Sequence, residues 1–154
     1  IIKQMRDAVP DVAITTDIIV GFPNETEDDF QATLDMVEMV EYDGAFTFIY
    51  SKRDGTPAAN WDDSISAEEK KDRFDRLIVA TKKYANKNND KYEGQIVEVL
   101  VDGVSKTDET MLSGYDRHNK LVNFKGDASM IGDIVYVQII EAKTWFLLGE
   151  QVDL

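Results

Sequence analysis

The sequence predicts an α/β segment followed by a small all-β barrel, and three patterns lead to this fold class. Two apolar runs at 14–20 and 45–50 flank a helical pattern at 26–40, which is the order of a strand–helix–strand unit in a parallel sheet. Five short strand-like runs with polar turns fill the last part of the chain, as in a five-stranded OB-like barrel. We therefore expect two domains, 1–90 and 91–154.

The first domain has clear signals for its elements. A helix end is expected at 3–8 and a strand at 11–20, whose consecutive apolar residues Ile18, Ile19 and Val20 predict burial on both faces. Thr26 with Asp29 three residues later resembles a capping box with the acid shortened by one carbon. We therefore expect a helix to begin at this threonine.

A long second helix is expected over 66–90, with Ser66 as its cap and Glu69 three residues later. Its apolar stripe is formed by Phe74, Leu77, Ile78, Thr81 and Tyr84. Beyond it, the five expected barrel strands are 96–101, 111–115, 120–124, 134–140 and 145–150.

Composition excludes several classes of function. The chain has no cysteine and one histidine, so neither a disulfide framework nor a metal site of thiolates or several histidines is expected. No apolar run approaches the ~20 residues that span a bilayer. The net charge of −13 argues mildly against a polyanion partner. Because the chain does not begin with methionine, we expect a fragment of a longer protein.

Loops at the carboxyl ends of parallel strands are where α/β enzymes bind ligands. Asp17 lies in the first strand and faces either a substrate pocket or a neighbouring strand. Gly21 either lets the backbone approach a ligand or makes only the turn. Arg53, after the second strand, either clamps a phosphate or carboxylate or forms a surface ion pair with Asp54 or a helix acid. These three residues are the candidate pocket residues.

The barrel contains candidate RNA contacts. Strand alternation sends one ring of Trp145-Phe146 inward and the other outward, where it could stack on a base. The alternative is that both rings complete the core or cover the end of the barrel. The mixed loop 115–120 is suited to RNA phosphates and bases. The full set of candidates is Tyr115, Arg117, Asn119, Lys120, Lys143, Trp145 and Phe146.

Longer motifs resemble a known family. The runs Thr15–Phe30 and Ala45–Ala59 resemble the fifth and sixth strand regions of radical-SAM methylthiotransferases, most closely the MiaB branch. The last part resembles the TRAM domain, through Ser113-Gly114, Val122-Asn123-Phe124 and Leu148-Gly149-Glu150. It departs from that pattern at Tyr115-Asp116, where the family commonly has arginine and threonine.

The resemblance implies the end of a (β/α) partial TIM-type barrel followed by a TRAM β-barrel. It also implies methylthiolation of C2 of isopentenyladenosine beside the tRNA anticodon, with S-adenosylmethionine and two [4Fe-4S] clusters. The cluster cysteines would lie upstream, so this fragment holds no catalytic residue or metal and is expected to be inactive alone. The intact enzyme is expected to be a cytoplasmic monomer, without membrane contact, that binds the tRNA anticodon stem-loop. Two alternatives stay open: a related methylthiotransferase with another tRNA or protein substrate, and a non-catalytic RNA-binding module.

Overall fold

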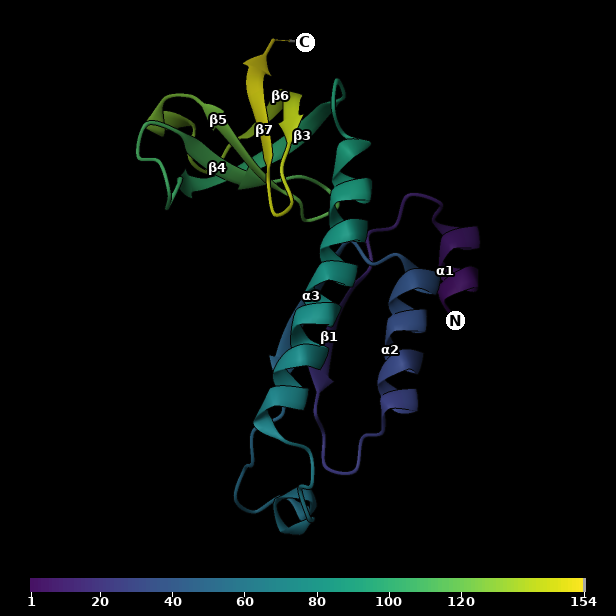
Figure 1. Ribbon diagram of the computed structural model, residues 1–154. Coiled ribbons are helices and arrows are strands. Elements are labelled where there is room, and N and C mark those ends of the chain that lie inside the picture. The colour runs from purple at the N-terminus through teal and green to yellow at the C-terminus, as the bar shows by residue number, and fades with distance from the viewer. Residues whose placement is uncertain (154) are drawn as a thin grey trace. The chain divides into compact units, whose positions relative to one another are not determined.

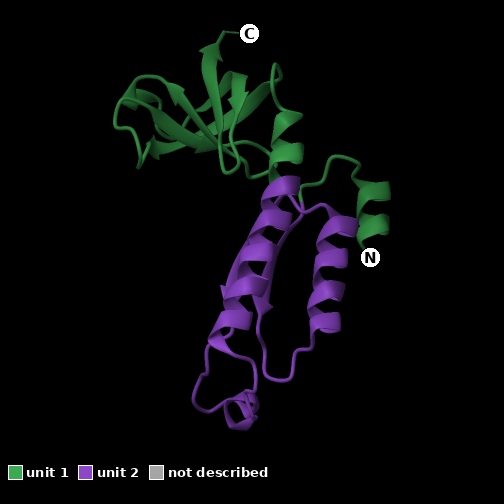
Figure 2. Ribbon diagram, viewed as in Figure 1, with its two compact units in different colours: residues 1–13, 85–154 green, residues 14–84 purple. Residues whose placement is uncertain are grey.

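The computed structural model describes residues 1–153, and the chain divides into two compact units (Figure 2). The α/β unit comprises residues 14–84. The barrel unit combines residues 1–13, which include helix α1 (Ile2–Ala8), with the chain from Ala85 onward. Helix α3 (Ala67–Asp90) is continuous across the boundary between the units. The expected division at residue 90 stays a prediction about domain organisation.

The α/β unit contains a parallel strand–helix–strand arrangement, as expected. Strand β1 (Thr15–Val20) pairs in parallel with β2 (Gly44–Ile49), and helix α2 (Glu27–Val40) connects them (Figure 1). In their register, Asp17 is opposite Phe46 and Ile19 is opposite Phe48. The described residues contain only these two strands of the sheet.

One face of this sheet is buried and the other is open. Val20 packs against residues of α2 and α3 in a core with Phe30, Val37, Leu77 and Tyr84. On the other face Ile19 is 54% exposed and Phe46 is 66% exposed. The prediction that β1 is buried on both faces is therefore wrong for the described residues. Three consecutive apolar residues place the middle side chain on the opposite face, and no described segment covers that face.

Both predicted helix caps are confirmed. In the first, the Thr26 hydroxyl accepts the Asp29 N–H at 3.2 Å, and the Asp29 carboxylate accepts the Thr26 N–H at 2.9 Å. Ser66 and Glu69 exchange the same two bonds before α3. These contacts satisfy N–H groups that have no partner within the helix.

The prediction of a small five-stranded barrel in the second part of the chain is confirmed, and the barrel is closed. Its strands are β3 (Ile96–Val104), β4 (Leu112–Tyr115), β5 (Leu121–Lys125), β6 (Ile134–Ala142) and β7 (Leu147–Val152). Their order in the sheet is β3–β4–β5–β7–β6, and every pair is antiparallel except β5–β7. Eight buried apolar side chains, including Phe124 and Ile139, fill its interior. Short 3₁₀ turns at Pro57–Asn60 and Ala128–Met130 complete the elements.

Two glycines allow the barrel strands to approach closely. A Cβ at Gly114 would lie 2.2 Å from the carbonyl oxygen of Leu100, and one at Gly149 would lie 2.4 Å from Val137 Cγ1. Both distances are far below van der Waals contact, so neither position accepts a side chain without a shift of its neighbours.

Among residues 1–153, no helix has the length and apolar character needed to cross a bilayer.

Candidate functional site

An apolar hollow of about 630 Å³ opens at the carboxyl ends of β1 and β2. Asp17 and Arg53, two of the three residues predicted for this pocket, are part of its lining. Two of the other lining residues, Ser51 and Thr56, are polar, and the rest are apolar or aromatic: Ile19, Phe22, Phe48, Ile49, Tyr50, Pro57, Ala58 and Trp61. A mainly apolar hollow with a few polar groups is the usual form of a small-molecule site.

Aromatic side chains form one wall of the hollow. The Phe22 ring meets Tyr50 edge to face at a centroid distance of 5.0 Å and Trp61 at 5.7 Å. The Tyr50 hydroxyl is buried and has no hydrogen-bond partner among the described residues. Because a buried polar group without a partner is unfavourable, this hydroxyl is a candidate hydrogen-bonding group for a ligand that fills the hollow.

Gly21, the third predicted pocket residue, is not among the lining residues and has clear local reasons to be glycine. Its φ of +70° is disfavoured for other residues, and a Cβ there would lie 2.6 Å from Lys70 Cγ. Its N–H donates to Glu25 Oε1 at 3.1 Å. The structure accounts for this glycine through the turn, and its approach to a ligand stays a prediction.

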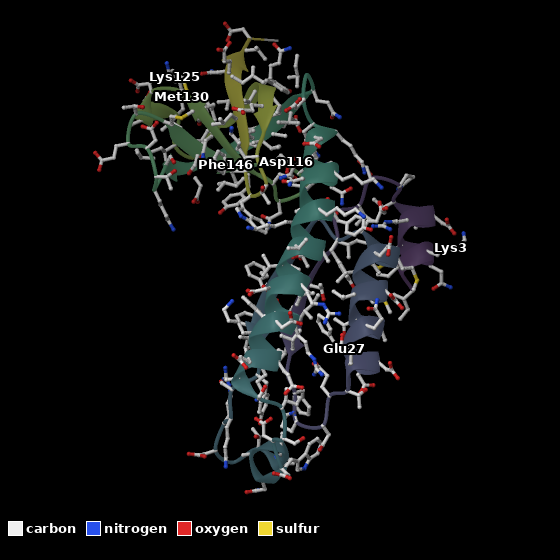
Figure 3. All side chains as sticks on the ribbon, in the orientation of Figure 1. Lys3, Glu27, Asp116, Lys125, Met130 and Phe146 are labelled. Carbon is white, nitrogen blue, oxygen red and sulfur yellow. The ribbon has the colours of Figure 1, made fainter. Side chains whose placement is uncertain are left out.

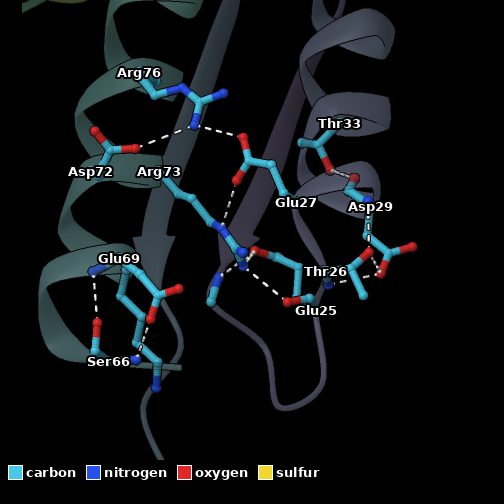
Figure 4. Close-up of polar contacts among 12 residues, drawn as sticks. Glu25, Thr26, Glu27, Asp29, Thr33, Ser66, Glu69, Asp72, Arg73 and Arg76 are labelled. Atoms are coloured by element: carbon cyan, nitrogen blue, oxygen red, sulfur yellow. Dashed lines mark hydrogen bonds and ion pairs between the residues drawn. The ribbon is translucent and has the colours of Figure 1, made fainter. Parts of the chain in front are cut away.

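An almost buried ion pair holds the turn that follows β1. Arg73 of α3 donates to Glu25 Oε1 at 2.8 Å and to the Glu25 carbonyl oxygen at 3.0 Å (Figure 4). The two side chains are only 7% and 12% exposed. Since Glu25 also accepts the Gly21 N–H, one carboxylate joins both ends of the turn that carries Phe22. The wall of the hollow is thus tied to α3.

A second, more exposed pair lies beside it. Glu27, at the start of α2, points toward α3 (Figure 3) and contacts Arg76 at 2.7 Å and Arg73 at 3.4 Å. The hydrogen bond from Arg76 to Glu27 raises the pKa of the guanidinium. Both guanidinium groups lie over the Phe30 ring, at 5.9 Å for Arg73 and 4.7 Å for Arg76, so this ring is packed against two cations.

In the barrel unit, the β4–β5 loop is shaped by the residue at which the sequence departs from the TRAM pattern. The buried Asp116 carboxylate accepts the N–H groups of His118 at 2.9 Å and Lys120 at 2.7 Å. Asn119 has a left-handed φ of 59°, which asparagine tolerates better than most residues. Aspartate and asparagine therefore define the turn at these positions.

The predicted RNA contacts of this loop differ in accessibility. Tyr115 is 41% exposed, and Asn119 is also exposed. Arg117 is exposed but hydrogen-bonds Glu98, and this bond lowers the pKa of the Glu98 carboxyl. Lys120 is only 9% exposed. Burial favours an indirect role for this lysine, and its direct contact with RNA stays a prediction.

The remaining predicted contacts lie in the β6–β7 turn. The prediction that Trp145 and Phe146 begin a strand is wrong, because the Lys143 N–H donates to the Phe146 carbonyl and closes a turn before β7. Trp145 is 54% exposed, whereas Phe146 is half-buried, so one ring is available to a base and the other is partly packed. Lys143 is exposed and pairs with Glu141.

Sequence reasoning did not single out Arg73, Asn89 or Trp61. A signal for Arg73 does exist, because it precedes Leu77 by four residues and so lies on the apolar stripe of α3. A charged residue on a buried stripe requires a partner. The chain offers no comparable pattern for the other two.

The fold and the family comparison together define the class of the barrel unit. Residues 90–152 match the family model for the TRAM domain, and this range includes all five strands of the closed barrel. The chain therefore carries a TRAM domain, as the motifs predicted.

Comparison with curated proteins extends this relationship to the whole chain. The chain is 54% identical over 153 residues to "tRNA-2-methylthio-N(6)-dimethylallyladenosine synthase" of Bacillus cytotoxicus, covering 99% of this chain and 30% of that protein. The synthase of the same name from Geobacillus kaustophilus is 54% identical over 99% of this chain and 29% of its own length. That of Acetivibrio thermocellus is 51% identical, with 99% and 32% covered. The chain is thus similar, over nearly all of its own length, to one part of the synthases of this name, and it spans about 30% of the length of these relatives.

Proposed function

We propose that this chain is part of a tRNA methylthiotransferase that adds a methylthio group to C2 of isopentenyladenosine beside the anticodon. The observation that carries the proposal is the identity of 54% across 99% of the chain to a synthase named for this product. The cofactors in this proposal are S-adenosylmethionine and two [4Fe-4S] clusters. The α/β unit would be the end of a partial TIM-type barrel, and the intact protein a cytoplasmic monomer.

The hollow fits a ligand with a planar ring and a polar part, such as S-adenosylmethionine or the target adenosine. Phe22 and Trp61 supply aromatic edges, and Tyr50 supplies a buried hydroxyl without a partner. Asp17 would accept hydrogen bonds from ribose hydroxyls or an amine. Arg53 would pair with a carboxylate or phosphate, for which a guanidinium is well suited. The role of these residues is therefore to bind and orient the ligand.

The clusters do not fit this part of the protein. The chain contains no cysteine, and residues 1–153 contain no group of three or more candidate metal-ligating side chains. Any cluster would have to be held by other parts of the longer protein. The 154-residue chain alone is accordingly expected to produce no methylthiolated tRNA.

In the barrel unit, stacking rather than charge is the proposed basis of binding to the anticodon stem-loop. A net charge of −13 opposes a large electrostatic contribution, whereas exposed rings stack on bases whatever the overall charge. Trp145 and Tyr115 are the exposed aromatic candidates. Polar contacts would come from Arg117, Asn119, Lys120 and Lys143, and the half-buried Phe146 would support the turn.

The test is complementation with the full-length gene in a strain that lacks its own synthase. We expect 2-methylthio-isopentenyladenosine to return in the tRNA, as measured by nucleoside mass spectrometry. Variants Asp17→Asn and Arg53→Met should retain the fold but reduce S-adenosylmethionine or substrate binding. Restoration of a different modification would reassign the substrate. Tight tRNA binding without any modification would favour a non-catalytic RNA-binding module and overturn the proposal.

A further inference from the structure

A buried asparagine at the end of α3 is bonded to the turn that carries Trp145. Asn89 is 3% exposed. Its side-chain amide donates to the carbonyl oxygens of Lys143 at 2.8 Å and Thr144 at 3.1 Å. These carbonyls belong to the two residues directly before Trp145. The amide therefore fixes the backbone from which the exposed Trp145 side chain projects.

The same asparagine is bonded to the β4–β5 loop. Lys120 Nζ donates to Asn89 Oδ1 at 2.8 Å, and the ammonium lies 5.8 Å from the centre of the Tyr92 ring. The Lys120 N–H is in turn held by Asp116 at 2.7 Å. One buried amide thus joins the two loops that contain the candidate RNA contacts.

The contacts of Asn89 are distinct from those that hold the barrel together. The barrel interior is formed by eight apolar side chains from the strands, and Asn89 is not one of them. Its side chain instead hydrogen-bonds the loop residues Lys143, Thr144 and Lys120. A nearby bond, from the Ala142 N–H to Glu93 Oε1 at 2.9 Å, also fixes the start of the β6–β7 turn. Asn89 therefore contributes to the position of the turn and not to the packing of the barrel interior.

We propose that Asn89 and Lys120 are positioning residues for RNA binding: they hold the 143–146 turn so that Trp145 is presented to an unpaired base. This inference rests on the proposed function, because it requires that the barrel unit bind the anticodon stem-loop. It also gives Lys120 a role that agrees with its burial. The lysine acts through Asn89 and the turn rather than on a phosphate.

The experiment measures binding of a fluorescent anticodon stem-loop RNA to the full-length protein. Asn89→Asp keeps the shape and the acceptor for Lys120 but replaces the donating amide with a carboxylate that repels the two carbonyls. We expect Trp145→Ala to weaken binding about tenfold, as for the loss of one base–aromatic stack, and Asn89→Asp to weaken it to a similar extent. In the Trp145→Ala background, Asn89→Asp should change affinity less than about twofold.

Two further variants complete the design. Asn86→Asp makes the same charge change at an exposed position of the same helix and should leave affinity within about twofold. Lys120→Met keeps the aliphatic stem and removes the ammonium, and it should weaken binding in the presence of Trp145 only. If Asn89→Asp does not fold, the inference is tested by the RNA affinity of Lys120→Met, measured with Trp145 present and in the Trp145→Ala background.

The outcomes separate the inference from the proposed function. If the unaltered full-length protein does not bind the stem-loop, the proposed function fails and the inference fails with it. If Trp145→Ala weakens binding but Asn89→Asp and Lys120→Met do not, the inference alone is overturned. An equal loss with and without Trp145 would also overturn it, because that result is expected of a general disturbance of the barrel.

Discussion

Replacing Arg73 by methionine should destabilise the α/β unit substantially. The substitution keeps an unbranched stem but leaves the Glu25 carboxylate, which is 12% exposed, without its cationic partner. Removal of one member of a buried ion pair costs about 3 kcal/mol, because the remaining charge stays desolvated. Arg76→Met is the matched control on the same helix. It breaks a pair whose side chains are 38% and 57% exposed, so its loss should be about 0.5 kcal/mol.

The assay is urea unfolding followed by tryptophan fluorescence. Trp61 lies in the α/β unit and Trp145 in the barrel unit, so a Trp145→Phe background reports on the α/β unit alone. Glu25→Gln provides a second test, because the amide keeps an oxygen for the Gly21 N–H but carries no charge. The double variant of Arg73 and Glu25 should be about 1–2 kcal/mol more stable than the sum of the single losses predicts.

Two results would refute this reasoning. One is an Arg73→Met loss no larger than that of Arg76→Met, which would mean that water reaches the Glu25 carboxylate freely. The other is simple additivity of the Arg73 and Glu25 changes, which would mean that the two groups do not interact.

Three further outcomes follow from single contacts. Gly114→Ala should destabilise the barrel by about 2 kcal/mol, because the new methyl group would overlap a backbone carbonyl. The control Gly103→Ala should be nearly neutral, because no atom lies within 4 Å of the added Cβ. Equal losses of stability in thermal melts of the two variants would argue against the close approach of the strands at Gly114. Thr26→Ala should cost about 1 kcal/mol at pH 7. The Thr26 hydrogen bonds lower the pKa of Asp29 from its usual value of 3.8. The stabilisation that they give is therefore fully present above pH 3.8 and is lost as the pH falls through the lower pKa of the folded state. Urea unfolding of the unaltered protein and of Thr26→Ala from pH 7 to 3 should show the difference between their free energies of unfolding decreasing. Tyr50→Phe should stabilise the chain by about 1 kcal/mol, since it removes a buried hydroxyl without a partner, and weaken ligand binding in the full-length protein; calorimetry showing unchanged binding would remove the hydroxyl from the site.

Much of the fold could be predicted because its signals are local. The Thr26–Asp29 and Ser66–Glu69 boxes lie within four residues of chain and depend on hydrogen bonds that a helix start always needs. The barrel strands were recognisable from alternation and polar turns. The error at Trp145 arose because alternation cannot distinguish the first residues of a strand from a turn that a single backbone bond, from Lys143 to Phe146, closes.

The candidate site was only partly predictable. Arg53 was found because it follows the end of a strand, and Asp17 because it is a charged residue within an apolar strand; both line the hollow. The aromatic wall formed by Phe22 and Trp61 was not found, because these residues are 39 positions apart. Nothing in the local pattern around either residue indicates that their rings meet.

The sequence alone indicated the order of the elements, the helix starts, a small five-stranded barrel and the resemblance to a known family, because each is encoded in periodicity, capping or continuous motifs. Closure of the barrel came from the structure. Only the tertiary structure showed that Arg73 holds the turn after β1 and that Asn89 joins two loops of the barrel unit. Both side chains satisfy buried partners distant in sequence, at separations of 48 residues for Glu25 and 54 for Lys143. Such pairs depend on how the chain brings distant elements together, and local sequence patterns do not indicate which distant residues meet.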